Sequence, residues 1–140
     1  MLPSADEYLA RIRAAPYIEG MWNAELEAYY RAEIREGSDG TARSVTSASA
    51  IAQALDGVIA EPWPELARRV RQPALLLNAS APYGPPGSPP LILPVHARAA
   101  ADIFPDARYV AVPGNHLTVV FGENAAVVAR EIIDFVVAPE

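Results

Sequence analysis

The sequence predicts an α/β fold, with helices over residues 1–61 and a right-handed β-α-β-α unit with two parallel strands over residues 62–140. A continuous apolar run at 73–77 is typical of a strand buried on both faces, and a second strand-like run follows at 108–112. Each run precedes a segment with helical character, and strands that alternate with helices form parallel sheets. The first sixty residues instead carry helix-start and helix-stop signals joined by polar turns.

The composition excludes several classes of function. With 140 residues, 51% of them hydrophobic and 20% charged, the chain is long enough to form a globular core. Its net charge of -6 and its lack of lysine argue against nucleic acid as a partner, because phosphates would be repelled. Since cysteine is absent, disulfides, cysteine-ligated metals and a thiol nucleophile are excluded.

Targeting signals are not apparent in the sequence. No apolar run approaches the roughly 20 residues that a membrane span needs. The first seven residues also lack the cationic and apolar regions of a signal peptide. We therefore expect a cytoplasmic protein with no membrane partner.

Three helices are expected in the first region. A capping box opens the first at Ser4, where a serine is followed three residues later by glutamate. The second is expected to start at Asn23 and to run through Ile34 to a stop at Gly37. The third is rich in alanine and should extend over about 46–55.

From Pro62 onward, prolines and apolar runs divide the chain. The segment 81–94 is so rich in proline and glycine that we expect a loop, and its length favours a functional role. The expected elements are, in order, a short helix at 65–71, a strand at 73–77, a helix at about 94–104, a strand at 108–112 and a helix at about 124–137.

His116 is the candidate catalytic residue. It closely follows the strand at 108–112, at the position where α/β folds place ligand-binding and catalytic groups. A histidine there can act as a general base near neutral pH. The alternative is a loop histidine hydrogen-bonded to the backbone, and position alone does not separate the two interpretations.

Four segments of the second region together match a known pattern. They are Pro73-Ala74-Leu75-Leu76-Leu77, Phe104-Pro105-Asp106-Ala107-Arg108-Tyr109-Val110, Val112-Pro113-Gly114-Asn115-His116 and Ile132-Ile133-Asp134-Phe135-Val136. In order and spacing this pattern resembles the C-terminal part of the α/β-hydrolase superfamily. The resemblance implies a partial α/β-hydrolase fold in which His116 is the triad histidine and Asn115 steadies its turn.

A weaker likeness extends upstream. The Leu2-Pro3-Ser4 start, the Trp22 to Tyr30 segment and Arg43-Ser44 look like the helical cap that some members of this superfamily carry. The resemblance therefore divides the chain into a cap-like region, 1–61, and a C-terminal core region, 62–140.

The nucleophile of the superfamily has no counterpart in the sequence. It lies in a G-x-S-x-G elbow between a strand and a helix, and this motif does not occur here. Ser38 and Ser88 have the wrong spacing and follow no buried strand, so we expect both to be loop residues. The resemblance places the nucleophile before Met1, which would make the chain a fragment of an enzyme.

The triad acid is also out of place. The superfamily commonly puts an aspartate shortly after the strand that ends near Leu77, but residues 78–84 hold no carboxylate. Asp102 and Asp106, on and after the connecting helix, are the remaining candidates to orient His116. The alternative is an acid on a preceding strand, which would also lie outside the chain.

The other notable side chains have simpler interpretations. His96 falls in a predicted helix, where a surface position is the usual one, and two histidines without a metal-ligand spacing argue against a metal site. No cofactor is expected. Of the aromatic residues, Tyr83 lies at the same sheet edge as His116 and is the one most expected to meet a substrate. Core packing and lining of a pocket between cap and core are the alternatives for Trp22, Tyr29, Tyr30, Trp63 and Tyr83.

The resemblance implies a serine-type hydrolase that acts on a small-molecule substrate, a small apolar ester, amide or lactone. The superfamily also contains dehalogenases, epoxide hydrolases, lyases and cofactor-free peroxidases, so the reaction type stays open. Without a nucleophile we expect the chain alone to be inactive. The alternative is a non-catalytic split or truncated half that pairs with a missing N-terminal half or with itself as a homo-oligomer, because two parallel strands leave an open apolar edge.

Overall fold

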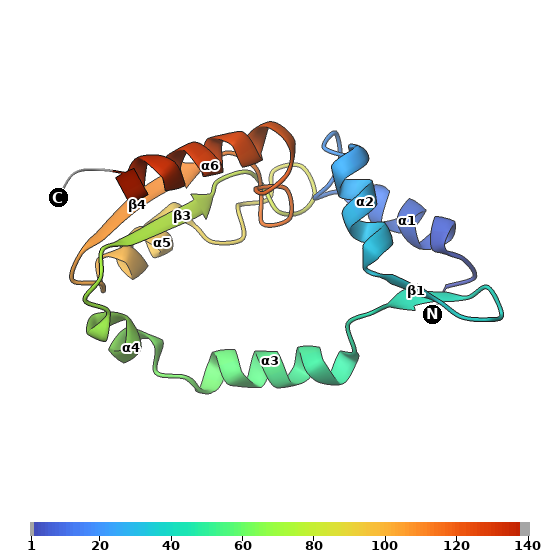
Figure 1. Ribbon diagram of the computed structural model, residues 1–140, viewed down its shortest axis with the longest axis horizontal. Helices are drawn as coiled ribbons and strands as arrows, with labels where there is room; N and C mark the ends of the chain where they lie inside the picture. Colours follow the sequence, from blue (N-terminus) through green and yellow to red (C-terminus); the bar gives the residue numbers. More distant parts are fainter. Residues whose placement is uncertain (1, 138–140) are drawn as a thin grey trace. The chain divides into compact units, whose positions relative to one another are not determined.

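The computed structural model describes residues 2–137 (Figure 1). It divides the chain into two compact units, Met1–Glu61 and Pro62–Glu140, each with its own two-stranded sheet. The division falls where Pro62 and Pro64 interrupt the chain. The mixture of helices and strands confirms the predicted α/β class.

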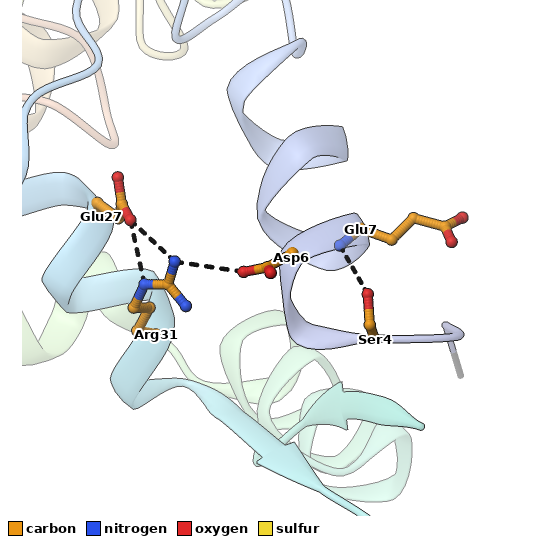
Figure 2. Close-up of polar contacts among 5 residues, drawn as sticks. All are labelled: Ser4, Asp6, Glu7, Glu27 and Arg31. Carbon is orange, nitrogen blue, oxygen red and sulfur yellow. Dashed lines mark hydrogen bonds and ion pairs between the residues drawn. The ribbon is translucent and has the colours of Figure 1, made fainter. Parts of the chain in front are cut away.

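Two capped helices open the first unit. α1 (Ala5–Arg13) begins after Ser4, whose Oγ accepts a hydrogen bond from the backbone N–H of Glu7 at 3.1 Å (Figure 2). α2 (Ala24–Ala32) begins in the same way after Asn23, whose side chain caps the first turn. Such caps satisfy backbone N–H groups that have no partner within the helix, so both predicted starts are confirmed.

Apolar burial stabilises this unit more than its surface ion pairs do. The buried apolar residues are Leu9, Ile18, Leu26 and Ala42. At the surface, Arg31 of α2 bridges Glu27 and Asp6 at 3.0 and 3.3 Å (Figure 2). The hydrogen bond to Glu27 and then that to Asp6 raise the pKa of Arg31. Exposed ion pairs of this kind contribute little, because solvent screens them.

The prediction that the second helix continues to Gly37 is wrong. Residues Ile34–Glu36 form β1, which pairs antiparallel with β2 (Ala42–Ser44), so the first unit is not all-helical. Gly37 N donates to Thr41 O at 2.7 Å across the turn. The Asp39 carboxylate accepts hydrogen bonds from the hydroxyl and the N–H of Thr41, which lower the pKa of Asp39. These bonds favour a hairpin over a further helical turn.

α3 (Ala48–Ala60) is longer than predicted and has no buried residue. The exposed fractions of Ile51, Leu55 and Ile59 are 50, 56 and 82%. The helix therefore depends on its Ser47 cap and on the high helix propensity of its alanines rather than on packing.

The second unit contains the predicted pair of parallel strands. β3 (Ala74–Ala79) and β4 (Ala107–Val112) pair in parallel, in a register that sets Ala74 opposite Ala107 and Ala79 opposite Val112. The connection by a helix confirms the β-α-β arrangement. The helices of this unit are α4 (Trp63–Arg69), α5 (Pro94–Ala101) and α6 (Gly122–Val137) (Figure 1).

The helices cover the strands unevenly. α5 contacts both strands and buries Ala97 and Ala101. α6 also contacts both strands, yet no residue of α6 is buried, and Ile133 and Val136 are 58 and 73% exposed. Within residues 2–137, none of the helices combines the length and the apolar character that a membrane span requires.

Candidate functional site

The turns that follow β3 and β4 are bonded to each other. Parallel pairing brings the carboxyl ends of both strands to one edge of the sheet, where α/β folds build their sites. Backbone and side-chain hydrogen bonds then continue the pairing beyond the strands. They run from Ser80 N and Ser80 Oγ to Val112 O at 3.0 and 2.9 Å, from Ala81 N to Gly114 O at 2.9 Å, and from Asn115 Nδ2 to Pro82 O at 3.2 Å.

The Asn115 side chain holds the turn after β4, as the sequence predicts. Its Oδ1 accepts hydrogen bonds from Leu117 N at 3.0 Å and from the N–H and hydroxyl of Thr118, both at 3.1 Å. The Thr118 hydroxyl in turn accepts from Asn115 N at 2.9 Å. Both residues are 2% exposed, so these bonds form away from competing water.

Gly114 fits this turn because it has no side chain. Its φ of +84° is a conformation that L-residues with a side chain rarely adopt. An added Cβ would lie 2.9 Å from Val119 Cα and 2.7 Å from Asn124 Nδ2. Asn124 also donates to Thr118 O at 3.1 Å, which ties the turn to the start of α6.

His116 lies exposed on this fixed turn. Its imidazole meets the ring of Tyr83 edge-on, with 5.8 Å between centroids and an interplanar angle of 89°. Tyr83 belongs to the proline-rich loop and donates its backbone N–H to Pro89 O at 3.0 Å. The prediction that Tyr83 and His116 share one sheet edge is confirmed.

A cavity of about 160 Å³ opens beside His116. Its walls are mostly aliphatic, and two polar side chains, His116 and Asn78, also line it. The full lining is Leu77, Asn78, Ala79, Leu91, Ile92, His116 and Val119. The site thus joins one histidine and one carboxamide to a small apolar space.

Asn78 lines the cavity, but the sequence does not predict it as a site residue. It is 5% exposed, and its Nδ2 donates to Ile92 O at 3.4 Å and to the Tyr109 hydroxyl at 3.3 Å. The Arg98 guanidinium lies 4.4 Å from the centroid of the Tyr109 ring and steadies it. The available signal was a polar residue at the carboxyl end of an otherwise apolar strand.

The candidate acids lie away from the histidine. Asp106 directly precedes β4, and its carbonyl oxygen accepts from Ala74 N at the first residue pair of the sheet, whereas His116 follows the other end of the strand. Asp102 caps the C-terminal end of α5, four residues earlier. Among the described residues of the second unit, 62–137, no carboxylate forms an ion pair with His116.

The remaining candidates fall outside this arrangement. Ser38 lies in the hairpin turn of the first unit, and Ser88 donates its N–H to Pro85 O within the proline-rich loop. His96 is exposed in the first turn of α5. Across the part of the chain that the structure describes, no group of three or more histidine, aspartate or glutamate residues is placed to hold a metal ion.

The aromatic residues divide between the units. Trp22 stacks on Tyr30 at 6.0 Å, and Tyr29 meets Tyr30 edge-on, all within the first unit. Trp63 lines a separate apolar cavity of about 340 Å³ with residues of α4 and the end of α5. Within the second unit, the Tyr83 ring contacts the His116 imidazole.

Comparison of the chain with protein-family models, curated proteins and solved structures gave no match. The chemistry of the site is therefore inferred from its own residues. They provide an exposed imidazole on a rigid turn beside a small apolar cavity.

Replacing Gly114 with alanine should destabilise the second unit more than replacing Gly87. Both glycines have a positive φ, +84° and +86°, so alanine costs about 1–2 kcal/mol at each. Only at Gly114 is there no room for Cβ, and overpacking should add about 1–3 kcal/mol. Thermal unfolding of the two variants measures the difference. Equal losses would show that this turn tolerates a side chain.

Proposed function

We propose that residues 62–140 supply the catalytic histidine of a serine-type hydrolase of the α/β-hydrolase kind. The observation that carries the proposal is the position of His116, on a rigid turn after β4 and beside a small apolar cavity. The order of elements from β3 to α6 and the Gly114-Asn115-His116 turn support it further.

His116 would act as the general base. When a serine hydroxyl attacks a carbonyl carbon, the imidazole takes the hydroxyl proton and then donates it to the leaving group. It next takes a proton from the water that releases the acyl group. An exposed imidazole on a fixed turn suits this role, because the base must keep its distance to the nucleophile through both steps.

The serine and the acid of the triad would come from a segment beyond these 140 residues. Ser38, Ser80 and Ser88 do not suit the nucleophile's role: Ser80 already donates its hydroxyl to Val112 O, and the other two lie in turns. The carboxylates of Asp102 and Asp106 belong to the opposite end of the sheet. The chain would therefore be catalytic only with its missing half.

The cavity indicates a small, mainly apolar substrate group. An engineered protein cavity of about 150 Å³ binds benzene, so about 160 Å³ accommodates a group of similar size. Its leucine, isoleucine and valine walls would not solvate a charge. Small esters, amides and lactones are consistent with both properties.

The kinetic test uses residues 1–140 alone and joined to the segment encoded upstream in the same reading frame. That segment should contain a G-x-S-x-G motif within roughly 150 residues, about one domain's length. The joined protein should hydrolyse p-nitrophenyl butyrate, and His116→Ala should lower kcat about 10⁴-fold or more with little change in KM. The chain alone should show no turnover.

His96→Ala is the matched control, because the other histidine of the chain is exposed on α5. It should leave kcat unchanged. Turnover by residues 1–140 alone that disappears in the His116→Ala variant would contradict the assignment of the nucleophile to another segment. An unchanged kcat for His116→Ala in the joined protein would contradict the role of the histidine.

A second candidate function is self-association without catalysis, and the exposed apolar surface of the second unit favours it. Within residues 2–137, β3 and β4 pair only with each other, and open strand edges bind further strands. α6 adds four exposed apolar side chains. These are Ile132, Ile133, Val136 and Val137, at 45, 58, 73 and 69% exposed.

For this candidate, light scattering coupled to size-exclusion chromatography should show a dimer or larger species. Changing Ile133 and Val136 together to glutamate should shift it toward monomer, because burial of two carboxylates in an apolar contact is costly. Asp134→Asn, a substitution at another exposed position of the same helix, should leave the mass unchanged. A stable monomer of the unaltered chain would argue against self-association.

A further inference from the structure

We infer that Asn78 makes the cavity selective for an uncharged group of about the size of benzene that carries one hydroxyl or N–H. The inference deepens the proposed function, on which it rests, by assigning a substrate feature to the same site. It starts from a buried carboxamide whose Nδ2 donates two hydrogen bonds, while its carbonyl oxygen accepts none from residues 2–137.

The orientation of this carboxamide is set by its neighbours. The Ile92 carbonyl oxygen can only accept a hydrogen bond, so the group that faces it must be Nδ2 and not Oδ1. Both hydrogen bonds of the Asn78 side chain are thus donated by Nδ2, to Ile92 O and to the Tyr109 hydroxyl. Oδ1 remains as an acceptor on a residue that lines the cavity.

The carboxamide is also held in place. Tyr109 lies on β4 at the position paired with Leu76, and Arg98 of α5 packs on its ring at 4.4 Å. The Ile92 carbonyl belongs to the proline-rich loop, so a strand, a helix and a loop together fix one side chain. A fixed acceptor binds a donor without a further loss of side-chain entropy.

The remaining walls define the rest of the ligand. Leu77, Leu91 and Val119 provide apolar contact and no hydrogen bond from their side chains. A ligand without a donor would remove water from Asn78 Oδ1 and leave that oxygen unpaired, which is costly. The cavity should therefore distinguish two molecules of the same shape by the presence of one donor.

Phenol and toluene are the probes for the test, because they share shape and size and differ in one donor. Each is titrated into residues 1–140 labelled with ¹³C, and the methyl signals of Leu77, Ile92 and Val119 report binding. The ratio of the toluene Kd to the phenol Kd should fall about fivefold in Asn78→Leu, the effect of one neutral hydrogen bond. In His96→Ala, a change at an exposed position of α5 that does not line the cavity, the ratio should stay as in the unaltered chain.

A measurement on the unaltered chain covers the case in which Asn78→Leu fails to fold. Phenol should shift the Asn78 ¹³Cγ signal through a hydrogen bond to Oδ1, and toluene should not. Equal shifts with both probes, an unchanged Kd ratio in Asn78→Leu, or no binding of phenol would each overturn the inference. These binding results do not depend on turnover, so the hydrolase proposal fails separately, through an unchanged kcat in His116→Ala.

Discussion

The buried carboxamide of Asn115 is the group on which the arrangement of the site depends. Its oxygen accepts three hydrogen bonds within its own turn, and its nitrogen donates to Pro82 O in the loop after β3. One side chain therefore fixes the turn that carries His116 and joins it to the loop that carries Tyr83. Because Asn115 is 2% exposed, loss of its side chain would leave buried donors without these bonds, which is costly.

Local signals in the sequence predict most of the elements but not the first sheet. The caps at Ser4 and Asn23 correctly predict helix starts, and the apolar run before Asn78 correctly predicts a strand. The expected burial of this strand on both faces is wrong, because its apolar residues are half-buried. The first strand of the hairpin, Ile34–Glu36, is predicted as the end of a helix, because Ile34 continues the helical spacing of α2. Its strands are defined by pairing across a turn, which helical periodicity does not report.

The sequence predicts only part of the site, because some of its contacts join residues that are distant in sequence. The place of His116 after a strand makes it a candidate, whereas its proposed role and the steadying of its turn by Asn115 come from the resemblance to the α/β-hydrolase superfamily. Asn78 was missed, because its importance arises from contacts with Ile92 and Tyr109, distant in sequence. The exposed apolar residues of α6 are consistent with both proposed functions. They would be covered either by the proposed upstream segment or by a second copy of the chain.

The most direct test of the central claim is the nuclear Overhauser effect between the ring protons of His116 and Tyr83 in the unaltered chain. The account predicts a clear effect between the two rings, and a further effect from the His116 ring to the Ile92 or Val119 methyl groups that line the cavity. Substitution of Asn115 by alanine should abolish both. An absence of ring-to-ring contact in the unaltered chain, with His116 signals typical of a freely moving loop, would contradict the account.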